Sequence, residues 1–188
     1  MIKIYKLGEQ VLREQAKPVS EVTDEIRQLL EAMFEAMIEA NGVGLAGPQV
    51  GKSLRLFVAI ADDDVRRVFI NPQIIATSEE QSDYEEGCLS IPGVYESIQR
   101  PTRVTVQALN ENGKPFTLEA DGLLARIIQH EYDHLNGTLF IDRGDPEFAA
   151  QTTANFKRRA ERAEKKAAEK VAKAKRIAAK IAAKAAKK

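Results

Sequence analysis

The chain has 188 residues, with one cysteine, two histidines and equal numbers of basic and acidic side chains. A chain of this length most often forms one domain whose core needs no disulfides, and the single cysteine, Cys88, has no internal partner. This composition excludes a disulfide-rich secreted scaffold and fits a reducing cytosol. No apolar run approaches the roughly 18 residues that cross a bilayer, and the N-terminus lacks the pattern of a secretory signal. We therefore expect a soluble, cytoplasmic protein that does not contact a membrane.

The net charge of zero conceals two regions of opposite charge. Residues 157–188 carry 14 lysine and arginine residues against 3 acidic residues, so residues 1–156 carry 14 against 25. A strongly basic segment and an acidic body attract different binding partners. We therefore expect the two regions to serve different purposes.

Residues 24–40 carry apolar side chains at helical spacing, and Thr23 can cap the start of this segment. The apolar positions are Ile26, Leu29, Leu30, Met33, Phe34, Met37 and Ile38. This pattern predicts an amphipathic helix near the N-terminus. The next stretch, residues 42–51, is too rich in glycine and proline for a helix or a strand, so it predicts a loop.

Short segments of β-type sequence occupy the middle of the chain, separated by turn residues. These segments are residues 54–60, 68–70, 73–77, 103–109 and 116–119. Asn112 and Gly113 lie between the last two segments and predict the tip of a hairpin. Strands in hairpins with separate helices are typical of the α+β class.

Two further helices are predicted towards the C-terminus. The first begins after Asp121, contains both histidines and ends near Gly137, and apolar side chains cover much of its circumference, which is typical of a buried helix. The second begins at Asp145 and Pro146 and continues into the Ala/Lys-rich end of the chain. The sequence thus predicts an α+β fold with antiparallel β-sheets packed around a buried central helix, an N-terminal amphipathic helix and a long C-terminal helix.

The central helix carries the pattern H-E-x-x-H at His130, Glu131 and His134. The four-residue separation places both imidazoles on one helix face, one turn apart, where they can bind one metal ion. Glu131 can then reach a metal-activated water without binding the metal itself. The less specific alternative is a pair of histidines that make ordinary hydrogen bonds on a helix.

A catalytic metal held by protein usually has three protein ligands and one open position for water. Because the chain has no third histidine, the third ligand is either Cys88 or a carboxylate. Cys88 follows Gly87, a residue that lets other backbone approach closely. The spacing alone leaves both alternatives open.

Three blocks of sequence together resemble the signature motifs of the peptide deformylase family, in the family's order. They are residues 42–49 (GVGLAGPQ), residues 86–90 (EGCLS) and residues 129–135 (QHEYDHL). The resemblance implies a metal-dependent amidohydrolase that removes the formyl group from the N-terminal formylmethionine of nascent polypeptides. It also implies a deformylase catalytic domain over residues 1–150, followed by a basic Ala/Lys-rich helical extension over residues 151–188.

The resemblance implies that Cys88, His130 and His134 are the ligands of a single divalent metal ion. A thiolate with two imidazoles suits Fe²⁺, Zn²⁺ or Ni²⁺ far better than Mg²⁺ or Ca²⁺. The family points to Fe²⁺ in the cell, and the sequence does not choose between Fe²⁺ and Zn²⁺.

Amide hydrolysis needs an activated water, a polarised carbonyl and a proton for the leaving amine. Glu131 is placed to take the proton of the water and to pass it to the departing nitrogen. The resemblance assigns the side-chain amide of Gln49 and the backbone N–H of Leu89 to the oxyanion that develops from the carbonyl.

Substrate binding is predicted in outline. An extended nascent chain would hydrogen-bond to main chain near Val43, Gly44 and Gly87. By family position, four groups line an apolar pocket for the methionine side chain. These are Val43, Leu123, Ile127 and the ring face of His130. The two helical aliphatic residues could equally belong to the core, and Arg126 stands where the family usually has an apolar residue, which leaves the far edge of the pocket undefined.

Residues 160–188 have high helix propensity and several oppositely charged pairs at i,i+4. One interpretation is a solvated helix that keeps the enzyme soluble. The other is electrostatic docking on RNA, because a dense positive segment binds phosphates without sequence preference. The resemblance favours ribosomal RNA near the exit of the nascent chain, and we expect the protein to be a monomer.

Two alternative functions are compatible with the motifs. A zinc endopeptidase would use the same helix to cut internal peptide bonds and would need a longer open cleft. A metal-stabilised RNA-binding protein would close the coordination sphere with a fourth protein ligand, which would have to be a carboxylate.

Overall fold

In the computed structural model the described residues are 2–185, and side chains are described for residues 2–175. The chain divides into two compact units, Met1–Ala149 and Ala150–Lys188. Among the described residues, no helix combines the length and the apolar character that crossing a membrane requires.

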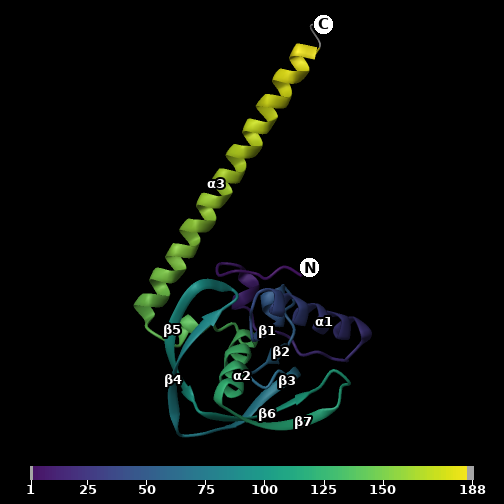
Figure 1. The fold of residues 1–188 in the computed structure, drawn as a ribbon, viewed down its shortest axis with the longest axis vertical. Helices are drawn as coiled ribbons and strands as arrows, with labels where there is room; N and C mark the ends of the chain where they lie inside the picture. Colours follow the sequence, from purple (N-terminus) through teal and green to yellow (C-terminus); the bar gives the residue numbers. More distant parts are fainter. Residues whose placement is uncertain (1, 186–188) are drawn as a thin grey trace. The chain divides into compact units, whose positions relative to one another are not determined.

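The first unit contains two antiparallel β-sheets and two α-helices, so the predicted α+β class is confirmed (Figure 1). The larger sheet has the order β1-β2-β3-β6-β7. Its strands are Gly44–Ala46, Leu56–Ile60, Arg66–Thr77, Arg103–Leu109 and Pro115–Asp121. The second sheet is a long hairpin of β4, Gln81–Cys88, and β5, Ile91–Pro101.

The larger sheet packs a helix on each face. Phe57 and Ala59 of β2 belong to a core cluster with residues of α2, Gly122–Leu135, whereas Leu56 and Val58 belong to a cluster with residues of α1, Asp24–Glu39. Adjacent residues of a strand point to opposite faces, so a strand that is covered on both faces reads as a continuous apolar run. The helix α2 is thereby packed against one face of the larger sheet.

The structure joins two of the predicted strands, residues 68–70 and 73–77, into the single strand β3. The register in which β3 pairs with β6 shifts between Ile70 and Gln73, and the backbone of Asn71 has a positive φ of 50°. The Asn71 side chain accepts a hydrogen bond from the backbone N–H of Val19 and donates one to its carbonyl. A bulge that is stabilised by hydrogen bonds to Val19, 52 residues away in sequence, explains why the sequence pattern breaks there.

The prediction of a loop over residues 42–51 is wrong. Gly44–Ala46 form the strand β1, which pairs with β2, and Gly47–Val50 form a short 3₁₀ helix. Every residue from Gly44 to Val50 is buried. Glycine is used here for close packing, because a Cβ on Gly47 would lie 2.7 Å from the carbonyl oxygen of Leu54.

The hairpin β4–β5 was not predicted from the sequence, because β4 is mostly polar and exposed on both faces. Only Glu86 among its eight residues is buried. The hairpin nevertheless contacts α2, since the Arg126 side chain donates hydrogen bonds to the backbone carbonyls of Ser82 and Ile98. The helix α2 therefore packs against the larger sheet and also bonds to the hairpin.

The remaining elements are helical. Two more 3₁₀ helices, Gln10–Arg13 and Phe140–Asp142, lie in the first unit. The helix α3, Pro146–Ala185, confirms the predicted long C-terminal helix. Residues 186–188 of the predicted extension lie outside the described residues.

Candidate metal centre and active site

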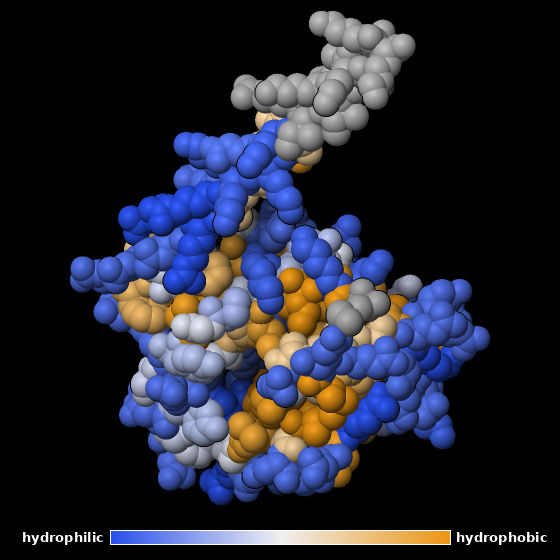
Figure 2. Space-filling model, turned by 45° about the horizontal axis from the view of Figure 1, so that its top comes forward, coloured by the Kyte–Doolittle hydropathy of each residue, from blue (hydrophilic) through white to orange (hydrophobic). Residues whose placement is uncertain are grey.

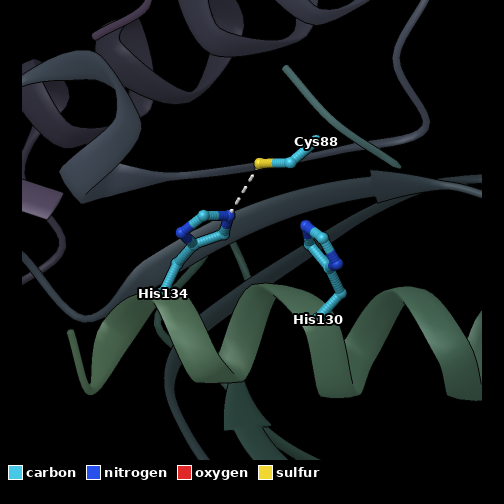
Figure 3. Close-up of side chains that lie close together, drawn as sticks. All are labelled: Cys88, His130 and His134. Atoms are coloured by element: carbon cyan, nitrogen blue, oxygen red, sulfur yellow. Dashed lines mark hydrogen bonds between the residues drawn. The ribbon is translucent and has the colours of Figure 1, made fainter. Parts of the chain in front are cut away.

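Three potential metal ligands converge from two separate elements. Cys88 ends β4, and His130 and His134 project from one face of α2 towards it (Figure 3). One ligand atom from each residue lies within 4.8 Å of the others. The Cys88 Sγ and the His134 Nε2 are 3.3 Å apart. The structure therefore brings Cys88 next to two histidines that follow it by more than 40 residues in sequence.

The donor set and its spacing fit a transition metal ion. Two ligands about 2.0–2.3 Å from one ion at a tetrahedral angle lie about 3.5 Å apart, close to the observed separation of sulfur and nitrogen. His130 directs its Nδ1 to Glu86 Oε2 at 2.8 Å, which leaves Nε2 for a metal. The His134 Nδ1 is buried and has no hydrogen-bond partner among the described residues. The three side chains could hold one ion and leave a fourth position for water.

A buried network of charges orients His130. Glu86 accepts hydrogen bonds from Arg100 Nε, Arg100 Nη2 and Arg126 Nη1 at 2.7, 3.0 and 3.0 Å. Arg100 also pairs with Asp133 at 2.7 Å, and Arg143 with the same carboxylate at 2.6 Å. Burial opposes the charge of Glu86, but its bonds with His130 and Arg100 prevail and lower the pKa of Glu86 to about 2. The carboxylate that orients the ligand is therefore ionised near neutral pH.

The surroundings shift the pKa values of the two histidines in opposite directions. Burial lowers the pKa of His130, but its hydrogen bonds with Cys88 and Glu86 outweigh burial and raise that pKa well above 6.5. Burial lowers the pKa of His134, and the positive charge of His130 lowers it further. A histidine must be deprotonated to bind a metal, and the raised pKa of His130 opposes that deprotonation.

Glu131 is buried, with 3 % of its surface exposed, and lines the same cavity as Cys88 and His130. Its Oε2 has no hydrogen-bond partner within the described residues. Burial is the main cause that raises the pKa of Glu131 to about 7. A Cβ on Gly44 would overlap the Glu131 carboxylate, so a glycine is required at that point of β1. A carboxylate with a pKa near neutrality can both accept and donate a proton.

The Gln49 side chain is fixed next to the sulfur of Cys88. Its Oε1 accepts a hydrogen bond from the Ala46 N–H at 2.7 Å, so its Nε2 must face the other way. That Nε2 lies 3.4 Å from Cys88 Sγ and 3.2 Å from Ser90 Oγ. Gln49 is buried, and the amide donor is held in place before any ligand binds.

The chain is similar to known proteins of one family. A family model described as polypeptide deformylase matches residues 1–149. A peptide deformylase of Treponema pallidum (strain Nichols) is 59% identical over 139 residues, which cover 74% of this chain and 85% of the relative. One of Fusobacterium nucleatum is 46% identical over 169 residues, which cover 87% and 97%.

The chain belongs to the peptide deformylase family. Solved structures of the family agree in fold. The peptide deformylase of Synechococcus elongatus in complex with actinonin has a TM-score of 0.77 and 46% identity, over 82% of this chain and 84% of the other. That of Legionella pneumophila has a TM-score of 0.78 and 42% identity, over 86% and 98%. Peptide deformylases are hydrolases that remove the formyl group from nascent peptides, and this chain is such an enzyme.

A cavity of about 630 Å³ opens beside Cys88 and His130, two of the three potential ligands. Almost all site residues that the deformylase motifs imply line it, and His134 alone of them does not. The lining includes Val43, Gly44, Gln49, Gly87, Cys88, Leu89, Leu123, Ile127, His130 and Glu131. Figure 2 shows hydrophobic side chains gathered beside a hollow on the face of the first unit.

Sequence reasoning did not account for every residue that lines this cavity. Arg126, which left the far edge of the methionine pocket undefined, lines the cavity and donates a hydrogen bond to Glu86. Tyr84 and Tyr95 line the same cavity, with 48% and 62% of their surface exposed. No sequence pattern indicated these two tyrosines, because they are exposed residues on a hairpin that was itself not predicted.

Proposed function

We propose that this peptide deformylase acts through one divalent metal ion bound by Cys88, His130 and His134, with Glu131 as the general acid and base. The observation that carries this proposal is the convergence of one thiol and two imidazole nitrogens beside a buried carboxylate in a cavity. The packing of α2 between the larger sheet and the hairpin supports a central helix that keeps these groups in fixed relation.

A bound ion supplies a Lewis acid that makes water a nucleophile near neutral pH and polarises the formyl carbonyl. Fe²⁺ is our proposal for the ion in the cell, and Zn²⁺ or Ni²⁺ would also suit a ligand set of one thiolate and two imidazoles. The thiolate donates charge to the ion, and the buried Glu86 carboxylate keeps the His130 ring oriented.

In this proposal Glu131 transfers a proton from the attacking water to the leaving group. Its carboxylate accepts a proton from the attacking water and later donates it to the departing nitrogen of the peptide. The raised pKa of about 7 supports both steps, because the group exchanges a proton at little cost near neutral pH. Its Oε2 is available for the water, since it has no partner among the described residues.

Two hydrogen-bond donors stabilise the oxyanion in this proposal. The Gln49 amide lies 3.4 Å from Cys88 Sγ, and Leu89, which follows Cys88 in sequence, lines the same cavity. Gln49 is oriented in advance by the Ala46 N–H, so its amide needs no reorganisation during the reaction. A neutral donor also avoids competition for the metal.

The substrate is an N-formylmethionyl nascent peptide bound in extended form. The main chain near Val43, Gly44 and Gly87 supplies hydrogen bonds to its backbone. Leu123 and Ile127 lie one turn apart on α2 and line the cavity, which supports their role in the methionine pocket. Arg126 also lines the cavity, and its guanidinium forms an ion pair with Glu86 at 3.0 Å.

Release of formate tests this function directly. We expect formate from formyl-Met-Ala-Ser and no product from its N-acetyl counterpart or from a peptide labelled on either side of an internal bond. A zinc endopeptidase would give the opposite pattern. Formate release that persists in full after removal of all divalent metal would contradict the metal mechanism.

We further propose that residues 1–150 form the catalytic domain and that residues 151–188 form a basic extension that docks on ribosomal RNA. The high density of lysine and arginine supports this, because such a segment binds phosphates. The enzyme would then work as a monomer in the cytoplasm, where nascent chains emerge. Sedimentation with ribosomes at low salt should be lost in a chain truncated after Phe156, and unchanged sedimentation would contradict the docking.

A further inference from the structure

The N-terminal segment Tyr5–Leu7 lies across the two stretches that carry the oxyanion donors. The Tyr5 N–H donates to the Gln49 carbonyl at 2.8 Å, and the Leu7 N–H donates to the Ser90 carbonyl at 2.9 Å. These bonds hold the residue between them, Lys6, over the segment Leu89–Ser90. The Lys6 Nζ donates to the Leu89 carbonyl at 2.6 Å.

That carbonyl belongs to the same peptide unit as the Ser90 N–H. In a planar trans peptide the C=O and the N–H point in opposite directions. The Ser90 N–H lies 3.4 Å from Cys88 Sγ. Lys6 therefore binds one end of a peptide dipole whose other end is directed at the sulfur.

The charge of Lys6 strengthens the hydrogen bond from the Ser90 N–H to the sulfur. A hydrogen bond from an ammonium is stronger than one from a neutral donor, and it polarises the peptide so that the N–H at the other end becomes a better donor. Hydrogen bonds to a ligand sulfur reduce the charge that it donates to a metal, which makes the metal a stronger Lewis acid. Besides the two histidines, the donors to this sulfur among the described residues are the Ser90 N–H and the Gln49 amide.

We propose that Lys6 is a positioning residue that acts on the Cys88 sulfur through the Leu89–Ser90 peptide. The inference rests on the proposed function, because it takes Cys88 to be a metal ligand. Among the described residues Lys6 makes no hydrogen bond to the sulfur or to the histidines; its exposed side chain lines the cavity, where its charge also acts on Cys88 through space. Its effect is therefore smaller than that of a direct neighbour of the ligands.

The test uses the full chain loaded with Co²⁺, whose thiolate-to-cobalt charge-transfer band reports on the sulfur. In Lys6→Met the band should move to longer wavelength, because a sulfur with a weaker hydrogen bond gives up its electron more easily. The kcat for formyl-Met-Ala-Ser should fall by about three- to tenfold, below the usual range for direct neighbours of a ligand, while KM stays within about twofold. Lys6→Arg should restore both the band and kcat.

Lys3→Met is the matched control, because Lys3 belongs to the same segment and contacts Glu9 rather than Leu89. It removes the same charge and should leave the band and kcat unchanged. An unmoved band in Lys6→Met, or an equal shift in Lys3→Met, would overturn the role of Lys6. Absence of any thiolate-to-cobalt band in the unaltered protein would instead overturn Cys88 as a ligand, and the inference with it.

A second measurement covers the case in which Lys6→Met binds cobalt poorly. The amide proton of Ser90 in the Zn²⁺-loaded protein should resonate further upfield in Lys6→Met than in the unaltered chain, because its hydrogen bond to sulfur weakens. An unchanged Ser90 resonance would contradict the proposal even if activity had fallen.

Discussion

The globular unit and the C-terminal extension hold their charges in opposite ways. Glu86, Arg100 and Asp133 each have side chains that are at most 6% exposed, and each is paired with another charge. In the extension, every side chain described from 157 to 175 is exposed. A buried charge depends on particular partners, whereas exposed charges produce a field in which one lysine can replace another.

This difference separates two kinds of function within one chain. Buried charges define the positions of single atoms, such as the Nδ1 of His130 and the carboxylate of Glu131. Exposed charges add to an overall potential that does not depend on the place of any one of them. Substitutions in the first unit should therefore have large and specific effects, and substitutions in the extension should have small and additive ones.

The largest effect is expected from Glu131→Gln. The amide has nearly the same shape but cannot accept the proton of the water, so kcat should fall by about 10³-fold, within the range for loss of general acid–base catalysis. Formate release and metal content are measured on the same sample. The matched change in the extension, Glu169→Gln, should leave kcat unaltered.

If Glu131→Gln kept most of its activity with a full complement of metal, the proton would have to pass through another group. If Glu169→Gln lost activity comparably, the contrast between the two regions would be wrong.

The next largest effect is expected from Gln49→Ala. Loss of one oxyanion donor should lower kcat by about 10²-fold, with little change in KM, because the donor acts on charge that develops in the transition state. Gln99→Ala provides the control, since Gln99 is exposed on β5. A rise in KM at constant kcat would show that Gln49 binds the substrate rather than the transition state.

The spacing of His130 and His134 predicted that both imidazoles share one face of a helix, because residues four apart on a helix lie one turn apart, and the structure brings Cys88 beside them. The network around Glu86 could not be predicted in the same way. It depends on where the hairpin β4–β5 meets α2, and the exposed, polar sequence of β4 gives no alternation of apolar and polar residues.

The errors in the fold have a similar origin. Residues 42–51 have the composition of a loop, but β2 and the backbone near Leu54 approach them so closely that glycine is required. Lys6 and Leu89 are 83 residues apart, and no local pattern connects them. Local patterns therefore predicted what one element positions, whereas contacts between elements were either missed or, as for Cys88 with the histidines, implied only by the family resemblance.

A pH-dependent effect on stability is expected for protein stripped of metal by a chelator. The raised pKa of Glu131 means that the folded state retains a proton that the unfolded state has already lost above its usual pKa of 4.5. The contribution of Glu131 to the free energy of unfolding should therefore fall by about 1.4 kcal/mol per pH unit from near pH 4.5 up to about pH 7 and stay constant above pH 7, while the raised pKa of His130 adds a separate fall above pH 6.5.

His134 contributes the opposite slope, because its lowered pKa makes stability rise with pH up to about 6.5. The difference between the unaltered chain and Glu131→Gln isolates the glutamate. Urea unfolding between pH 4 and pH 8 should give a difference that grows as the pH rises to 7. A difference that is constant over this range would show that Glu131 has an ordinary pKa.

The smallest effect on catalysis is expected from removal of the extension. Truncation after Phe156 removes 14 basic residues but none that lines the cavity, so kcat/KM for short formyl peptides should change by less than about twofold. The measurement is the same formate assay at two salt concentrations. A loss of tenfold or more would show that the extension takes part in the active site.

The most direct test of the central claim is diffraction at the absorption edge of the metal from crystals of anaerobically purified protein. We predict one anomalous peak bonded to Cys88 Sγ, His130 Nε2 and His134 Nε2 at about 2.0–2.3 Å, with no fourth ligand from the protein. A peak at other residues, or one whose coordination a carboxylate completes, would contradict the proposed catalytic centre.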